Sequence, residues 1–172
     1  SDQGQKSPAN MLTTTLADEN RIATNFKGKT IGVAIKDRGS ILSSGHTANA
    51  AYWFEGGETG NFITSSYYLD SLPSWVQKFN SSRKIDKYLK TWNTLYDISS
   101  YIESGPDDNN YESNFRGEKK AVFPHNFKIK SDKTGKSYYG ALASTPFGNS
   151  EPYTNILIPP GIAAPALTEA LV

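Results

Sequence analysis

The sequence predicts an α/β unit over residues 1–45, followed by a mixed α+β subdomain over residues 46–149. An amphipathic helix leads through a short turn into an aliphatic strand, and this order is typical of half of a parallel α/β sheet. Farther along, two aromatic and β-branched runs flank a glycine-rich stretch, which predicts a β-hairpin followed by short helices. Residues 150–172 form a proline-rich tail.

The first predicted helix spans residues 8–24 and begins at Pro8. Ser7 can cap it, and proline is tolerated at the first helical position, where its missing N–H would be unpaired anyway. Residues that would share one helix face then recur every three or four positions: Leu12, Leu16, Glu19 and Ala23. A Lys-Gly-Lys tripeptide at 27–29 ends the predicted helix.

The strand predicted over residues 30–35 reads TIGVAI and has no polar alternation. Such a pattern is typical of a strand that is covered on both faces. A parallel sheet needs several strands, and no second unit of the same kind is obvious downstream. We therefore expect the chain to be part of something larger.

The hairpin is predicted from residues 51–54 and 61–68 on either side of a Gly-Gly-Glu-Thr-Gly stretch. A sugar-binding surface of aromatic rings is possible there, but hairpins this aromatic usually bury one face, and we favour the core. Helical spacing of apolar residues predicts short helices over 73–80 and 83–91.

The remaining segments carry weaker signals. Residues 105–110 combine glycine, proline, aspartate and asparagine, which indicates a surface loop. Residues 111–146 show little periodicity, and we expect scattered short strands there. In the tail, only residues 165–171 have a pattern that predicts a helix.

Composition excludes several classes of function. Eighteen basic and 17 acidic residues are scattered and give a net charge of +1, so no global field attracts nucleic acid or anionic membranes. The absence of cysteine excludes disulfides, cysteine-ligated zinc and thiol catalysis. No apolar run approaches the roughly 18–20 residues that span a bilayer.

The inventory of catalytic side chains is small. A zinc site needs three or four suitably spaced ligands, whereas the two histidines, His46 and His125, lie far apart in the sequence. His46 follows a loop of small residues, and it either lies near a functional site or satisfies local backbone groups. We favour the second interpretation. Asp107 and Asp108 resemble a carboxylate pair, but their surroundings favour a solvated loop over an acid/base dyad.

Lys36 and Arg38 flank Asp37 directly after the aliphatic strand. Residues i and i+2 leaving a strand point the same way, and open α/β sheets bind ligands beyond the carboxyl ends of their strands. Arginine offers a planar fork and lysine a compact charge, a pairing that suits phosphoryl oxygens. The residues alone leave a phosphate site and a solvated strand end equally supported.

A series of motifs favours the phosphate site over the solvated strand end. In chain order they read SPANMLTTTLADE at 7–19, VAIKDRGSIL at 33–42, GHTANAAYWFE at 45–55, GNFITSSYY at 60–68, LPSWVQKFN at 72–80, WNTLY at 92–96 and STPFGN at 144–149. From residue 7 to about residue 149 the chain thereby resembles the PafA-type alkaline phosphatases. These belong to the alkaline phosphatase superfamily, together with the nucleotide pyrophosphatases/phosphodiesterases.

The resemblance implies a mechanism for the parent enzyme. In that family a threonine or serine nucleophile forms a covalent phospho-enzyme that water then hydrolyses, and two zinc ions assist. Lys36 and Arg38 match family residues that contact non-bridging phosphoryl oxygens in the transition state. Asp37 is expected to point the opposite way and to serve packing or a salt bridge.

The resemblance also implies what this chain lacks. The family's nucleophile and first zinc-binding aspartate lie upstream of the matched region, and the remaining aspartate and histidine ligands lie downstream. We therefore expect no catalytic residue and no metal ligand in this chain, which would contain one core unit and the cap insertion after it. Ser43 and Ser44 stand where we expect a proline and a small residue, and the tail departs from the family pattern.

The main hypothesis is that the chain is the cap-containing fragment of a zinc-dependent phosphatase or phosphodiesterase and is inactive alone. A phosphate ester is then the substrate of the parent, which we expect to be an exported or periplasmic monomer without nucleic-acid partners or a membrane span. The alternative is a stand-alone, non-catalytic module derived from the cap that binds a ligand or partner.

Overall fold

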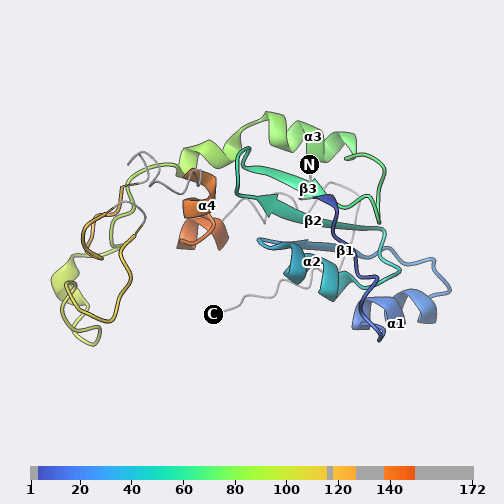
Figure 1. Ribbon diagram of the computed structural model, residues 1–172, viewed down its shortest axis with the longest axis horizontal. Coiled ribbons are helices and arrows are strands. Elements are labelled where there is room, and N and C mark those ends of the chain that lie inside the picture. Colours follow the sequence, from blue (N-terminus) through green and yellow to red (C-terminus); the bar gives the residue numbers. More distant parts are fainter. Residues whose placement is uncertain (1–3, 116–117, 127–137, 150–172) are drawn as a thin grey trace.

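The computed structural model of the protein describes residues 4–115, 118–126 and 138–149, and within them one mixed three-stranded sheet is the central element (Figure 1). Its strands are β1 (Ile31–Ala34), β2 (Ala50–Glu55) and β3 (Asn61–Thr64), in that spatial order. Strand β1 pairs with β2 in parallel, with Ile31 opposite Ala50. Strands β2 and β3 are antiparallel. The mixed α and β composition agrees with the predicted fold class.

Helix α2 (Asp37–Ser44) connects β1 to β2 and completes a β–α–β unit. The sequence predicts a strand followed by a loop at this position, so the helix is a correction. Its residues, DRGSILSS, are poor helix formers, and its stability comes from packing Ile41 on the sheet rather than from local propensity. The second parallel strand that the sequence does not reveal is β2, whose aromatic residues indicate only a hairpin.

Helix α1 (Leu16–Ala23) is half as long as predicted. Its N-cap is Thr15, whose hydroxyl accepts a hydrogen bond from the Asp18 amide while the Asp18 carboxylate accepts one from the Thr15 amide. This capping box fixes the start of the helix, because it satisfies amides that have no partner within the helix. The expectation that the helix starts at Pro8 is wrong: Pro8 is buried in a turn closed by the Met11 amide.

The predicted hairpin is confirmed. Strands β2 and β3 are joined by a turn in which Glu55 accepts hydrogen bonds from the amides of Gly57 and Thr59, at 2.6 and 2.8 Å, and from the Thr59 hydroxyl at 2.7 Å. Burial of Glu55 works to raise its pKa, but these hydrogen bonds outweigh it and lower the pKa. The Glu55 carboxylate therefore supplies hydrogen-bond acceptors to turn amides that do not pair between the strands.

The two faces of the sheet carry two separate apolar clusters, and α2 and α3 (Ser74–Ser81) lie on opposite faces (Figure 1). Alternation along β2 sends Tyr52 and Phe54 to the α3 side, and Ala51 and Trp53 to the α2 side. The hairpin's aromatic residues are therefore core, as predicted. All four residues of β1 are only partly buried. Ile31 and Val33 pack against the cluster on the α3 side of the sheet, and Gly32 lies against α2 on the other side.

Helix α3 confirms the prediction for residues 73–80, with Pro73 as its N-cap. The segment predicted as a helix over 83–91 is instead the 3₁₀ helix η2 (Lys84–Tyr88). Near the end of α3, the Asn80 amide group accepts from the Phe62 N–H and donates to the Phe62 carbonyl, both at 2.9 Å. Asn80 thereby occupies backbone groups at the outer edge of β3, where another strand would otherwise bind.

The remaining described elements are η3 (Ile98–Ser100), α4 (Tyr138–Leu142) and η4 (Pro146–Asn149). Residues 92–115 and 118–126 extend away from the sheet (Figure 1). The loop 105–110 is largely exposed, as predicted. The short strands expected over 111–146 do not form in the described part of that segment. Its one β-type pairing there is an isolated bridge from His125 to Trp92. The tail and its predicted helix at 165–171 lie outside the described residues.

The edge contact of Asn80 yields a stability prediction. Replacing Asn80 by alanine removes two hydrogen bonds to Phe62 backbone groups, and we expect a loss of about 1–3 kcal/mol in the free energy of unfolding. Urea denaturation of the purified chain measures the loss. Ser81→Ala, an exposed position on the same helix, is the control and should change stability by less than about 0.5 kcal/mol. Equal stability of the two variants would contradict the edge role.

Candidate functional site

The candidate site is the junction between β1 and α2, where the sequence places Lys36 and Arg38. Strand β1 ends at Ala34, Lys36 is the N-cap of α2 with extended φ and ψ of −113° and 147°, and Arg38 lies in the first helical turn. Both side chains are exposed. Within the part of the chain that the structure describes, neither side chain has an ion pair or hydrogen bond. Two cations are thus available to a ligand.

The geometric reason that the sequence offers for this pair is wrong. It treats Lys36 and Arg38 as alternate residues of one strand, but the strand has ended before Lys36 and the helix has begun before Arg38. Both residues instead belong to the N-terminal end of a helix, Lys36 as its N-cap and Arg38 in its first turn. They nevertheless lie beyond the carboxyl end of a parallel strand, where open α/β sheets bind ligands.

The start of α2 contributes to the electrostatics of the junction. Amides in the first turn of a helix have no partner within the helix and give its N-terminus a partial positive charge. The Lys36 side chain does not cap the helix. Asp37 accepts a hydrogen bond from the Arg38 amide at 2.8 Å and makes no salt bridge among the described residues. Asp37 therefore helps to begin the helix, while the other first-turn amides add to the attraction for an anion.

His46 lies at the other end of α2. An eight-residue helix is about 12 Å long, so His46 and the two cations belong to different sites. Its Nδ1 is 3.7 Å from Asp18 Oδ2, and its carbonyl accepts from the Tyr67 hydroxyl at 3.2 Å. The side chain is about one-third exposed, at 32%. These contacts place His46 beside the anchor of α2 rather than beside Lys36 and Arg38.

The anchor of α2 is built on the buried carboxylate of Asp18, which is 1% exposed. Oδ1 accepts from the amide and the hydroxyl of Thr47, both at 2.8 Å, and Oδ2 accepts from the amide and hydroxyl of Thr15 at 3.0 and 3.1 Å. Burial works to raise the pKa of Asp18, but the hydrogen bonds from Thr47 and Thr15 hold it far below its usual value. The ionised carboxylate thus joins α1 to the loop after α2.

Gly45 ends α2 against this carboxylate. Its φ of +74° is strained for other residues, and a Cβ there would lie 2.0 Å from Asp18 Oδ2 and 2.4 Å from Thr15 Oγ1. The Tyr68 hydroxyl donates to the Gly45 carbonyl at 2.6 Å. The C-terminal end of α2 is therefore held from two sides, by α1 and by the segment after β3.

Arg21 extends the anchor to the starts of both parallel strands. Its Nε donates to the Thr47 carbonyl at 3.0 Å, and its guanidinium also donates to Asn49 Oδ1 at 3.1 Å and to the Gly28 carbonyl. Asn49 Oδ1 in turn accepts from the Thr30 amide at 2.9 Å. Sequence reasoning missed this network, because its members are up to 28 residues apart.

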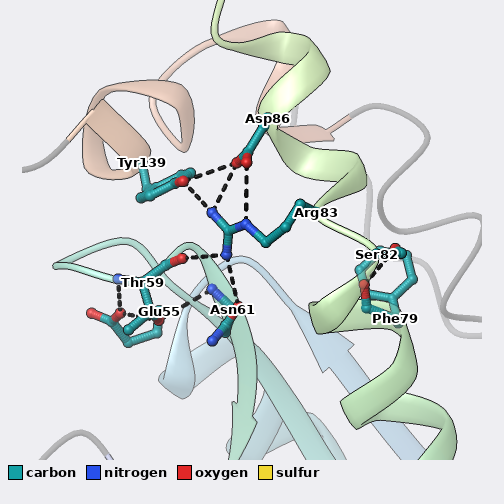
Figure 2. A network of polar contacts seen from close by, with 8 residues as sticks. All are labelled: Glu55, Thr59, Asn61, Phe79, Ser82, Arg83, Asp86 and Tyr139. Carbon is teal, nitrogen blue, oxygen red and sulfur yellow. Dashed lines mark hydrogen bonds and ion pairs between the residues drawn. The ribbon is translucent and has the colours of Figure 1, made fainter.

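A second polar network lies at the far end of the hairpin and centres on Arg83 (Figure 2). Arg83 donates to both carboxylate oxygens of Asp86, at 3.1 and 2.8 Å, to the Thr59 carbonyl at 2.8 Å and to Asn61 Oδ1 at 3.1 Å. The Tyr139 hydroxyl contacts Arg83 and donates to Asp86 at 2.9 Å. Every member has a partner, so this network docks α4 on the hairpin.

The second histidine, His125, lies in neither network. It is 7% exposed, packs on Trp92, Phe115 and Phe123, and its Nδ1 is 2.6 Å from a carboxylate oxygen of Glu118. The carboxylate pair weighed from sequence is also divided: Asp107 accepts from the Phe123 amide at 3.0 Å, and Asp108 pairs with Lys120. Asp107 and Asp108 therefore stabilise loops.

The structure also bears on metals and membranes. Among the described residues, no group of three or more histidine, cysteine, aspartate or glutamate side chains is placed to hold a metal ion. These described residues therefore do not fit a zinc site. In the same part of the chain, no helix is both long and apolar enough to cross a bilayer.

The fold and the junction define a β–α–β unit with two exposed cations at the start of its helix. No protein-family model matches the chain. It is 50% identical over 151 residues to alkaline phosphatase PhoV of Synechococcus elongatus and 49% identical over 148 residues to a calcium-transporting ATPase of Myroides odoratus. It is 41% identical over 148 residues to alkaline phosphatase PafA of Elizabethkingia meningoseptica. Each match covers 86–87% of this chain and 26% of the relative.

Solved structures agree with these relatives. The crystal structure of wild-type PafA superposes with a TM-score of 0.77 at 41% identity, over 86% of this chain and 28% of that one. A PafA variant with four substitutions superposes with a TM-score of 0.78. The chain is therefore homologous to one segment of the PafA-type alkaline phosphatases, members of the alkaline phosphatase superfamily. It spans about a quarter of the length of the curated relatives that it matches.

The buried Asp18 carboxylate yields a pH prediction. Because the folded-state pKa lies below the unfolded value of about 3.9, its stabilising effect is complete above that value and is lost as the pH falls toward the folded pKa. We expect Asp18→Asn to lose about 2–4 kcal/mol at pH 7 and to show a weaker fall in stability between pH 5 and about pH 2.

Urea denaturation across this pH range tests the prediction, with Asp70→Asn, an exposed aspartate, as the control. The control should keep the pH dependence of the unsubstituted chain. An Asp18→Asn variant with that same dependence would show that Asp18 is not ionised in the anchor.

Proposed function

We propose that the chain supplies the phosphate-contacting cations, Lys36 and Arg38, to a hydrolase of phosphate esters. The observation that carries the proposal is their position: two exposed side chains, without ion-pair partners among the described residues, in the first turn of a helix just beyond a parallel strand. Relatives named alkaline phosphatases support it. In the four-substitution PafA variant, one changed lysine and one changed arginine are also two positions apart.

The chemistry of the two side chains suits a phosphoryl group. The planar guanidinium of Arg38 can donate two parallel hydrogen bonds to two oxygens, and Lys36 adds a compact charge. The first-turn amides of α2 add a partial positive charge of the same sign. The fold fixes the backbone positions of these groups at the start of α2, and they would stabilise negative charge on the non-bridging oxygens.

One relative is named an ATPase and two are named alkaline phosphatases, and the proposed role of the two cations is compatible with either activity. An ATPase and a phosphatase each cleave a phosphorus–oxygen bond, so cations that contact phosphoryl oxygens would serve either reaction.

The rest of the reaction is proposed for a longer protein that carries this segment. There, a threonine or serine oxygen would bond to phosphorus as the ester oxygen leaves, and water would then cleave the phospho-enzyme. Zinc, held by residues other than the described ones, would supply Lewis acidity. We further propose that residues 46–149 act as the cap, that the protein is exported, and that it works as a monomer.

Phosphate binding by the purified chain tests the two cations. Titrating the ¹⁵N-labelled chain with inorganic phosphate should shift the amide signals of the first turn of α2. Lys36→Ala or Arg38→Ala should weaken the affinity at least about tenfold, a change of about 1.4 kcal/mol. In a full-length enzyme the same substitutions should lower kcat/KM, and the decrease should correspond to a loss of about 1–3 kcal/mol of transition-state stabilisation.

Lys27→Ala is the matched control, since it removes one exposed positive charge. Lys27 precedes the amino end of β1, whereas Lys36 and Arg38 follow its carboxyl end. It should leave the affinity within about twofold, the size expected for a screened, distant charge. Phosphate binding that is absent, or equal in all three variants, would mean that Lys36 and Arg38 are a solvated helix start.

The chain by itself should not turn over substrate. With zinc and an aryl phosphate added to the 172-residue chain, we expect hydrolysis at the rate of the buffer alone. A full-length relative is the positive control. Zinc-dependent turnover by the chain at a comparable rate would contradict the proposed division of labour. Specific capture of another ligand without phosphate binding would instead favour a stand-alone binding module.

A further inference from the structure

Helix α2 lies unusually close to β1, because small residues meet at their contact. Gly32 is the second residue of the strand, and a Cβ built on it would lie 1.8 Å from Ser44 Oγ and 2.8 Å from the Ser40 carbonyl oxygen. Real Cβ atoms essentially never approach other heavy atoms to less than 3.0 Å. The φ of Gly32 is not in the left-handed region. Glycine is therefore required here for space and not for backbone conformation.

The atoms that a side chain on Gly32 would meet have little room to move. Ser40 and Ser44 are each 1% exposed, and the Ser44 hydroxyl donates to the Ser40 carbonyl at 2.7 Å. The Ser44 hydroxyl can rotate away, but the Ser40 carbonyl belongs to the backbone of α2. A larger residue at position 32 therefore has to move the helix itself.

The anchor at Gly45 decides which end of the helix moves. The C-terminal end of α2 is held through Gly45 by the Asp18 carboxylate, Thr15 and the Tyr68 hydroxyl. Its N-terminal end has no comparable anchor among the described residues, although Gly39 lies close to Ala34. A helix pushed outward beside Ser40 therefore pivots about its C-terminal end. Lys36 and Arg38, at the far end, are displaced the most.

We propose that Gly32 is a positioning residue for the phosphate-contacting cations. By carrying no side chain, it sets the distance between α2 and β1 and so fixes where Lys36 and Arg38 stand beyond the strand. The inference rests on the proposed function of these two residues. Displacing a contact by about 1 Å can cost up to roughly a hundredfold in rate, so the position of α2 matters to the reaction as well as to stability.

The test compares phosphate affinity and thermal stability in the 172-residue chain. Gly32→Ala should weaken the binding of inorganic phosphate at least about fivefold, at a temperature where the variant is fully folded. Combining it with Ser44→Gly, which removes the closest clashing atom, should restore part of the affinity. If Gly32→Ala does not fold, Ser44→Thr, which adds one methyl group to the same contact, takes its place.

Val76→Ala is the control for a merely structural effect. Val76 is fully buried on α3, on the opposite face of the sheet, so this substitution lowers the melting temperature without touching the α2 contact. We expect its phosphate affinity to stay within about twofold of the unsubstituted chain. Affinity that falls equally in Val76→Ala and in Gly32→Ala, relative to their loss of stability, would overturn the positioning role.

Two further outcomes separate this inference from the proposed function. If Lys36→Ala weakens phosphate binding while Gly32→Ala or Ser44→Thr binds phosphate normally, the positioning role is wrong and the proposed function stands. If the unsubstituted chain binds no phosphate, or the Lys36→Ala and Arg38→Ala variants bind it normally, both are overturned. A loss of affinity in Gly32→Ala, rescued by Ser44→Gly and absent in Val76→Ala, supports both.

Discussion

The buried carboxylate of Asp18 is the interaction on which the arrangement of the β–α–β unit depends. It accepts four hydrogen bonds, from the amides and hydroxyls of Thr15 and Thr47, and so begins α1 and fixes the loop after α2 at the same time. An ionised group this far from water is tolerated only when hydrogen bonds replace its hydration. Gly45 is required beside it, because any Cβ would enter the carboxylate.

From this fixed end, the rest of the unit follows by close packing. Small residues at positions 32 and 34 face α2, while Ile31 and Val33 face the cluster on the other side of the sheet. The chain leaves β1 and enters α2 within two residues, so the start of the helix stands directly beyond the strand. The two ends of α2 thus differ: its C-terminal end is buried and held, and its N-terminal end is exposed and carries Lys36 and Arg38.

The relatives place this unit in a broader setting. Homology at 41–50% identity extends over 86–87% of this chain, yet the chain spans about a quarter of each relative. The β–α–β unit carries the two cations, whereas a metal site needs a group of histidine, aspartate or glutamate ligands that the described residues do not bring together. The division of the chain at residue 45 remains a proposal, and the sheet itself continues across that position from β1 to β2.

The sequence by itself indicated the family resemblance, the hairpin and the core role of its aromatic residues, because each depends on local pattern or motif, and it singled out Lys36 and Arg38 as candidates. Tertiary structure decided the rest. Helix α2 has weak propensity and forms against the sheet, and the Asp18 carboxylate that closes the capping box of α1 also binds Thr47, 29 residues away. Lys36 and Arg38 stand at the N-terminal end of a helix and not on a strand, because α2 begins at Asp37.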